Sequence, residues 1–236
     1  MHTVCATTRA RGPLALNDIS FSAMPGTITA VVGHTGSGKS TTAELACALK
    51  LPLGGSVRIN GIDTADLSRR KELRRYIGYG SQLPERQLFA ETVFDNVAFG
   101  PRNLGISEKE VSYLVHKALE AVNLKPNTNL LRRSPFGLSG GQQRSVALAG
   151  VLAMNQPILV LDEPMAGLDP QGRSHVRALL RQLKQAGSTL LMVTHSMDDV
   201  AELADQVIAL DHGALIAAGA PADVLPQLAA LYREEE

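Results

Sequence analysis

The chain has 236 residues, which is somewhat long for one average domain and short for two, so it fits one domain or a core with an embedded subdomain. Its 23 basic and 23 acidic residues cancel to a formal net charge of zero, which argues against a protein held on nucleic acid by a bulk positive field. Hydrophobic residues make up 44%, too many for a disordered chain, and 4% aromatic residues leave few surfaces for base stacking. Cys5 and Cys47 are too few for a disulfide scaffold, so we expect a reducing compartment.

No segment of the sequence approaches the roughly 20 consecutive apolar residues that a membrane-spanning helix needs. The N-terminus, MHTVCATTRARGPLAL, lacks the continuous apolar run of a secretory signal. We therefore expect a soluble chain with no direct membrane span, which reaches a membrane through partner subunits.

Short apolar runs alternate with helical patterns in the first and last thirds of the sequence. The predicted strands are Thr27–Val32, Ile158–Leu161, Thr189–Val193 and Val207–Leu210. The helices predicted among them are Lys39–Leu49 and Pro170–Gln185. This alternation is typical of a parallel sheet wrapped by helices.

The middle of the sequence has helical patterns and no convincing strand. Ser107 and Glu110 form an S-x-x-E capping box before an amphipathic helix. A loop is predicted from Pro126 to Pro135, and a second helix from about Gly141 to Met154. The sequence thus predicts an α/β core of residues 1–83 and 151–236, interrupted by a helical subdomain of residues 84–150.

The sequence GHTGSGKS, from Gly33 to Ser40, fits the pattern G-x-x-x-x-G-K-[ST] between a predicted strand and a predicted helix. Glycines let such a loop turn its backbone N–H groups around phosphate oxygens. Lys39 can reach the terminal phosphates, and the Ser40 hydroxyl can ligate Mg²⁺. A glycine-rich turn with an ordinary surface lysine is the alternative, which the strand–loop–helix context disfavours. The predicted nucleotide-binding residues here are Gly33, His34, Thr35, Gly36, Ser37, Gly38, Lys39, Ser40 and Thr41.

The sequence LSGGQQR, from Leu138 to Arg144, stands at the predicted start of a helix. Ser139 suits an N-cap, but Gly140 and Gly141 weaken the helix start by about 1 kcal/mol each relative to alanine. Such glycines are tolerated where something must approach the backbone closely, and an anion at a helix N-terminus is the obvious candidate. A flexible loop before a core helix is the alternative interpretation.

The sequence ILVLDEP, from Ile158 to Pro164, delivers Asp162 at the carboxyl end of an apolar strand. In a sheet that carries a phosphate-binding loop, such an aspartate can hold Mg²⁺. Glu163 follows and can orient and deprotonate an attacking water. The alternative is that the two acids simply end a strand and begin a turn.

The phosphate loop, LSGGQ and the Asp-Glu strand, in this order, resemble the ATP-binding cassette (ABC) ATPase family from about Leu16 to Leu225. The resemblance implies an α/β fold: a P-loop NTPase (RecA-like) parallel-sheet core with an antiparallel β part near the N-terminus and the inserted helical subdomain. Gln82 matches the Q-loop glutamine that senses Mg²⁺ and the attacking water, Asp169 the D-loop aspartate, and His195 the switch histidine that contacts the γ-phosphate.

The same resemblance implies a mechanism with ATP and Mg²⁺. Two cassettes face head to tail and sandwich two ATP molecules, so a monomer should bind ATP but hydrolyse it poorly. Ser139, Gly140, Gly141 and Gln142 would contact the nucleotide that the other cassette binds. The residues expected to act on the chain's own nucleotide are Lys39, Ser40, Gln82, Asp162, Glu163 and His195. Four further histidines, His34, His116, His175 and His212, have no such support and are expected to be exposed.

The segment from Gly80 to Gly105 resembles the Q-loop region of energy-coupling-factor (ECF) transporter ATPases, which power uptake of vitamins and metal ions such as cobalt. Their short acidic helix matches Pro84–Phe89, and the A-F-G-P-x-N pattern matches Ala98–Asn103. In this family the region shapes a groove that receives a coupling helix of the transmembrane subunit. GHTGSGKST and LDEPMAGLDP resemble the second of the two ATPases that such transporters use.

The resemblance implies three partners: a second ATPase subunit in a heterodimer, a transmembrane coupling subunit and a membrane substrate-binding subunit. It places the chain peripherally at the cytoplasmic face of the cell membrane. A cobalt, nickel or other ABC transporter remains an alternative. Soluble ABC ATPases that act on DNA or ribosomes carry long coiled-coil insertions or two cassettes, which 236 residues do not accommodate, and LSGGQ counts against a kinase or GTPase.

Two features depart from the family pattern. Family members usually place an aromatic residue about where Thr7 to Arg11 lie, to stack on adenine, but this sequence has no aromatic residue before Phe21. Arg9 or Arg11 could supply the stacking plane, or a partner could. Members of this kind also often continue into a C-terminal helical segment used for dimer contacts. This sequence ends at Glu236, which leaves a reduced interface or a shortened chain as interpretations.

Overall fold

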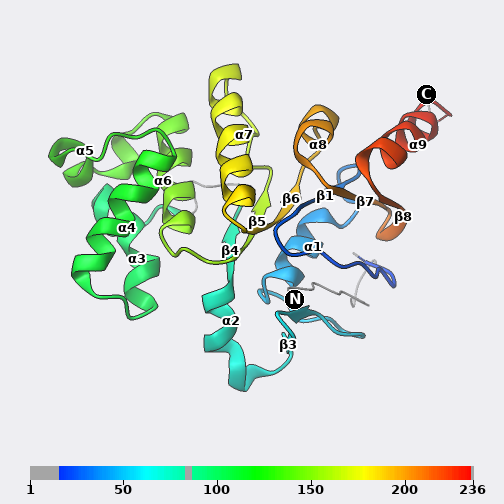
Figure 1. Cartoon of the computed structure of the whole chain (residues 1–236), viewed down its shortest axis with the longest axis horizontal. Helices are drawn as coiled ribbons and strands as arrows, with labels where there is room; N and C mark the ends of the chain where they lie inside the picture. The colour runs from blue at the N-terminus through cyan, green and yellow to red at the C-terminus, as the bar shows by residue number, and fades with distance from the viewer. Residues whose placement is uncertain (1–15, 83–86, 235–236) are drawn as a thin grey trace.

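The computed structural model describes residues 16–82 and 87–234 (Figure 1). Its centre is a six-stranded sheet in the order β4-β5-β6-β1-β7-β8. The first five strands are parallel, and β8 runs antiparallel to β7 at one edge. The strands are β1 (Ile28–Val32), β4 (Ile77–Gly80), β5 (Ile158–Asp162), β6 (Thr189–Val193), β7 (Gln206–Asp211) and β8 (Ala214–Gly219). The predicted parallel-sheet core is confirmed.

The central strands are buried along their whole length, because helices cover both faces of the sheet. In β6, Leu191 and Val193 point into one hydrophobic cluster, and Leu190 and Met192 point into the other. Figure 1 shows α7 (Pro170–Gln185), α8 (Met197–Leu203) and α9 (Pro221–Glu234) on one face. On the other face lie α1 (Lys39–Ala46) and α2 (Arg70–Tyr76), the latter preceded by a 3₁₀ turn at Leu67–Arg69.

The expected antiparallel part near the N-terminus is a small hairpin. It pairs β2 (Arg58–Ile59) with β3 (Ile62–Asp63). Asn60 and Gly61 connect the strands with φ angles of 52° and 79°, the left-handed values that an Asn-Gly hairpin turn requires. The fold class is thus confirmed in both its parts.

The helical lobe consists of α3 to α6, which lie beside the sheet in Figure 1. Its helices are α3 (Val93–Asn103), α4 (Glu108–Ala121), α5 (Thr128–Arg132) and α6 (Gly140–Leu152), with a 3₁₀ turn at Pro135–Gly137. They enclose a separate hydrophobic cluster that includes Val97, Val115 and Leu119, and Leu179 of α7 joins that cluster to the core. No strand occurs in the described part of this lobe. We keep residues 84–150 as the proposed bounds of the subdomain.

Three local predictions are wrong. The segment Pro126–Pro135 is not a plain loop, because Asn127 caps α5 by accepting a hydrogen bond from the Leu130 N–H at 2.9 Å. The helix predicted over Lys39–Leu49 ends at Ala46. Ser107 is the N-cap of α4, but its side chain makes no capping hydrogen bond, so the capping box is not formed.

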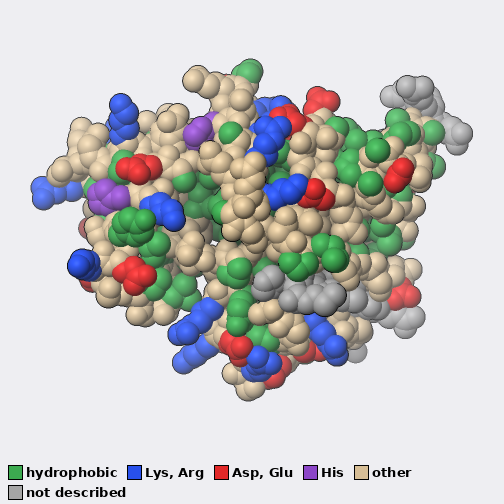
Figure 2. Space-filling model, in the orientation of Figure 1, with side chains coloured by type: hydrophobic (Ala, Val, Ile, Leu, Met, Phe, Trp, Pro, Cys, Tyr) green, Lys and Arg blue, Asp and Glu red, His purple; other side chains and the backbone are tan. Residues whose placement is uncertain are grey.

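Figure 2 shows blue and red side chains interspersed over the visible face, without a broad area of one sign. This distribution agrees with the formal net charge of zero. Within the part of the chain that the structure describes, no helix is both long and apolar enough to cross a membrane.

Candidate active site

The phosphate-binding loop lies between the end of β1 and the start of α1. Gly33 has a φ of 147°, and a Cβ there would overlap the carbonyl oxygen of Leu210 and lie 2.6 Å from the Ser37 Oγ. Gly36 and Gly38 also adopt positive φ values, 85° and 103°. These glycines are required by the path of the loop, which passes tightly against β7. The Ser37 hydroxyl is buried and has no hydrogen-bond partner in the described structure.

The Lys39 side chain folds back onto the backbone of this loop. Its Nζ donates hydrogen bonds to the carbonyl oxygens of Gly33 at 2.8 Å and His34 at 2.7 Å. Burial lowers the pKa of the ammonium group, while the negative charges of Glu163 and Asp162 oppose that shift. The ammonium group is therefore held near the acidic pair at the end of β5.

Asp162 ends β5 deep in the site, with only 4% of its surface exposed. The Ser40 hydroxyl hydrogen-bonds its carboxylate, and burial raises the pKa of Asp162 above its usual range. Within the described residues, Oδ1 has no hydrogen-bond partner. A buried carboxylate oxygen without a partner beside a serine hydroxyl fits the ligands that Mg²⁺ takes from proteins when phosphates and waters complete its shell.

Glu163 has the backbone geometry of a strained site residue. Its φ is 52°, unusual for a residue other than glycine, and its backbone N–H donates to the Val193 carbonyl of β6 at 2.9 Å. Its side chain is 9% exposed, and its Oε1 lies 2.8 Å from Nδ1 of His195. The imidazole of His195 is 72% exposed, so this pair presents a carboxylate and an open ring nitrogen to a ligand.

The start of α6 forms the capping box that the start of α4 does not. The Ser139 Oγ accepts a hydrogen bond from the Gln142 N–H at 3.3 Å, and the Gln142 Oε1 accepts one from the Ser139 N–H at 3.2 Å. A Cβ at Gly140 or Gly141 would meet nothing within 4 Å. The chain's own packing therefore does not explain these two glycines.

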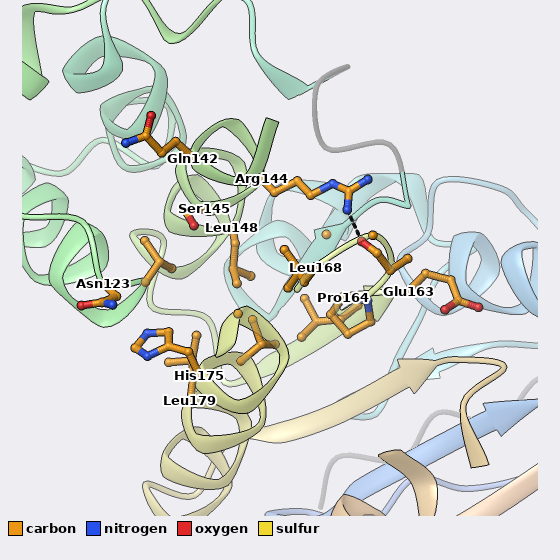
Figure 3. A pocket seen from close by; sticks show the side chains of 18 of the residues that line it. Asn123, Gln142, Arg144, Ser145, Leu148, Glu163, Pro164, Leu168, His175 and Leu179 are labelled. Atoms are coloured by element: carbon orange, nitrogen blue, oxygen red, sulfur yellow. Dashed lines mark hydrogen bonds between the residues drawn. The ribbon is translucent and has the colours of Figure 1, made fainter. Parts of the chain in front are cut away.

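A cavity of about 870 Å³ lies between the helical lobe and the core (Figure 3). The predicted site residues that line it come from both sides: Gln82, Ser139, Gly141, Gln142, Asp162, Glu163 and Asp169. Asp169 is exposed and caps α7 through the Gly172 N–H at 2.7 Å. Gln82 is exposed where it follows β4. The residues of the phosphate loop are not among those that line this cavity, although Asp162 and Glu163, which lie near Lys39, are.

Some expectations about individual residues need correction or fall outside the structure. His34 and His212 are exposed, but His116 and His175 are half-buried. Their ring nitrogens lie 2.7 Å and 3.1 Å from the carbonyl oxygens of Ser112 and Ala121. Half of the predicted helix Pro84–Phe89, residues 84–86, and both candidate adenine-stacking arginines, Arg9 and Arg11, lie outside the described residues.

Sequence reasoning assigned no role to Arg144, which contacts the core from α6. A signal was available, since Arg144 is a lone cation just before an apolar run of the helix. Its acceptor is a backbone carbonyl, Ala166, and backbone acceptors leave no mark in the sequence.

A family model described as "ABC transporter" matches residues 16–166, so the chain belongs to the ABC transporter family. The energy-coupling factor transporter ATP-binding protein EcfA2 of Streptococcus pyogenes serotype M3 is 45% identical over 224 residues, 94% of this chain and 79% of that protein. The predicted resemblance to ECF transporter ATP-binding subunits is confirmed, and the designation EcfA2 agrees with the second of the two types.

Solved structures show the same fold. A dimeric ATP-binding cassette in a post-hydrolysis state with ADP and Pi is 28% identical, with a TM-score of 0.84 and coverage of 94% of this chain and 99% of that one. The cbiO1 protein of Clostridium perfringens, part of the ABC transporter complex cbiONQ, is 31% identical, with a TM-score of 0.83 and coverage of 98% and 93%. ATP binding and hydrolysis follow from membership of this family.

Proposed function

We propose that this chain is the ATP-hydrolysing subunit of an ECF-type importer, which powers uptake of vitamins or other micronutrients through membrane subunits. The observation that carries the proposal is the convergence of three groups at one edge of the sheet. The phosphate loop, the buried Asp162 and the Glu163–His195 pair stand at the ends of adjacent strands β1, β5 and β6. The 45% identity to an ECF ATP-binding protein supports the transport assignment.

The roles of the residues follow from their positions. The loop from Gly33 to Thr41 would hold the ATP phosphates by backbone N–H groups, and Lys39 would exchange its carbonyl partners for phosphate oxygens. Ser40, Asp162 and Gln82 would hold Mg²⁺, which neutralises charge that develops on the phosphates. Glu163 would accept the proton of the attacking water as general base, and His195 would contact the γ-phosphate.

We further propose that the working site is shared between two cassettes. Gly140 and Gly141 have free space around them and Ser139 is exposed, which suits a nucleotide approaching from another subunit. Gln142 and Asp169 would stand at the same contact. A second ATPase subunit, in a heterodimer, is the proposed partner, and the dimeric state of the related cassette with ADP and Pi supports pairing of two cassettes.

The membrane partners would dock near α3. Phe89 and Phe99 are 56% and 49% exposed, and their rings meet edge to face at 4.6 Å between centroids. Buried Asn96 fixes this surface, because its Oδ1 accepts from the N–H groups of Phe89 at 3.0 Å and Ala90 at 3.3 Å. An exposed aromatic pair on a fixed backbone suits a coupling helix of a transmembrane subunit. The chain would then lie peripherally at the cytoplasmic face of the membrane.

A decisive experiment for the catalytic proposal is Glu163→Gln, with Glu110→Gln as a matched control on an exposed face of α4. The first variant should bind ATP within about twofold of the parent and lose at least about 100-fold in turnover, because only the proton acceptor is removed. The control should match the parent in both. Near-parental hydrolysis by Glu163→Gln would exclude Glu163 as general base.

The assignment to an ECF importer is tested by affinity purification from detergent-solubilised membranes. A small integral substrate-binding subunit, a transmembrane coupling subunit and a second ATPase should co-purify. Recovery of an assembly of the cbiONQ kind instead would favour the second candidate, to which the cbiO1 likeness points. Recovery with ribosomes would contradict a transport role.

A further inference from the structure

Arg144 reaches from the helical lobe to the core. It belongs to α6, five residues after Ser139, and its Nη1 donates a hydrogen bond to the Ala166 carbonyl, drawn as a dashed line in Figure 3. Ala166 lies in the connection between β5 and α7. The contact therefore joins α6, which begins at the LSGGQ segment, to the segment that runs from Glu163 to Asp169.

Gly167 is shaped to receive this guanidinium group. Its φ of 67° lies in the left-handed region. A Cβ there would overlap Nη1 of Arg144 and lie 2.9 Å from Nη2 and 3.0 Å from Cζ. The backbone conformation favours glycine at this position. A side chain there would also have to displace the guanidinium group from its place beside Ala166.

The connection that Arg144 holds is itself fixed at both ends. The Ala166 N–H donates to the Glu163 carbonyl at 3.1 Å, and the Leu168 N–H donates to the Met165 carbonyl at 3.3 Å. Asp169 then caps α7. Ala166 is three residues from both Glu163 and Asp169, so its carbonyl lies in the short segment that positions both side chains.

A second polar contact crosses between the lobes. Nε2 of His175 on α7 lies 3.1 Å from the Ala121 carbonyl at the end of α4, well apart from Arg144 in Figure 3. Leu148 of α6 and Leu179 of α7 also line the cavity between the lobes. Of the two polar contacts, that of Arg144 is the one whose acceptor, Ala166, lies in the segment between Glu163 and Asp169.

We propose that Arg144 is a positioning residue that links the two nucleotide sites of the assembled dimer through one chain. The inference rests on the proposed function, in which Ser139 meets the nucleotide of the other cassette and Glu163 acts on the chain's own. A nucleotide that orders the start of α6 would then, through Arg144 and Ala166, place Glu163 at the other site. Loss of the link should uncouple the sites without removing either of them.

The test compares Arg144→Met with Arg144→Lys in the complex purified from membranes. The control is Arg173→Ala. Nε of Arg173 donates to the Leu168 carbonyl at 3.2 Å in the same connection, but Arg173 belongs to α7 and so does not join the helical lobe to the core. For Arg144→Met we expect kcat to fall about 10- to 100-fold at unchanged ATP affinity. The Hill coefficient for ATP should fall from above one towards one. Arg144→Lys should keep part of kcat and part of the cooperativity, because the lysine ammonium group can still donate to the Ala166 carbonyl.

Three outcomes would overturn the inference: parental kcat and cooperativity in Arg144→Met, an equal loss in Arg173→Ala, or a parent without cooperativity. If Arg144→Met unfolds, Gly167→Ala tests the same contact with the arginine present and should show the same kinetic change. A variant with both Arg144→Met and Gly167→Ala should lose no more turnover than the worse of the two single variants, because both substitutions remove the same contact. Retained turnover in Glu163→Gln would instead refute the proposed function, so the two failures are distinguishable.

Discussion

At the scale of a single residue, Asp162 is subject to two opposing requirements, the stability of the nucleotide-free fold and the binding of Mg²⁺. It is 4% exposed, its Oδ1 has no partner in the described structure, and burial raises its pKa. An ionised carboxylate in that setting costs stability when no cation is bound. The proposed Mg²⁺ role needs the same carboxylate ionised. The residue is thus placed for ligand binding at the expense of the nucleotide-free fold.

Asp162→Asn should therefore stabilise the nucleotide-free protein at neutral pH by about 1 kcal/mol, the low end of the cost of an unsatisfied buried polar group. Because the folded-state pKa is raised, the folded state binds more protons, and the parent loses stability as pH rises from the ordinary carboxyl pKa through the raised value. The gain in the variant should vanish in acid, below the ordinary carboxyl pKa. Chemical unfolding at both pH values measures this gain.

The same chemical unfolding is also measured with Mg²⁺ and ATP present. Mg²⁺ and ATP should raise the stability of the parent and raise that of Asp162→Asn much less, since the variant lacks the carboxylate. A variant that is less stable than the parent at neutral pH, by the same amount as in acid, would show that the carboxylate carries no burial cost.

At the scale of elements, the two helix starts with a capping-box pattern behave differently. Ser139 and Gln142 exchange both capping hydrogen bonds at the start of α6, whereas the Ser107 side chain makes none at the start of α4. The pattern alone does not decide the geometry, because the side-chain rotamer at the N-cap depends on the chain that precedes it.

Ser139→Ala should cost about 1 kcal/mol of unfolding free energy, and Ser107→Ala only a few tenths. Urea denaturation of the two variants gives the comparison directly. Equal losses would mean that the capping bonds of Ser139 contribute nothing to stability.

The elements also show what the sequence could predict and why. Thr189–Val193 and Pro170–Gln185 were predicted with their observed bounds, because one is continuously apolar and the other strongly periodic. β4 and β8 were missed, since Ile77–Gly80 contains two glycines and Ala214–Gly219 is a half-exposed edge strand that is rich in alanine. α5 was missed because five residues show no helical period.

The candidate site was predictable in its residue types but not in its contacts. The motifs named Asp162, Glu163 and His195, yet the 2.8 Å approach of Glu163 and His195 joins residues on different strands. The contact from Arg144 to the Ala166 carbonyl depends on how the helical lobe lies against the core. Such contacts follow from tertiary packing, which a single sequence does not reveal.

At the scale of the whole molecule, one chain carries two half-sites, and the phosphate loop of one does not line the cavity that Ser139 of the other lines. The phosphate loop and Glu163 belong to the core, and Ser139 stands on the helical lobe across a cavity of about 870 Å³ that the loop does not line. The open space at Gly140 and Gly141 has no occupant within the described chain. The account therefore requires a second cassette to complete each site.

The most direct test is a crystal structure of the Glu163→Gln complex with ATP and Mg²⁺. We expect two cassettes head to tail, with Ser139 Oγ of one within about 3 Å of the γ-phosphate that the other holds in its Gly33–Ser40 loop. ATP fully enclosed in a single subunit, with Ser139 far from any phosphate of a companion chain, would contradict it.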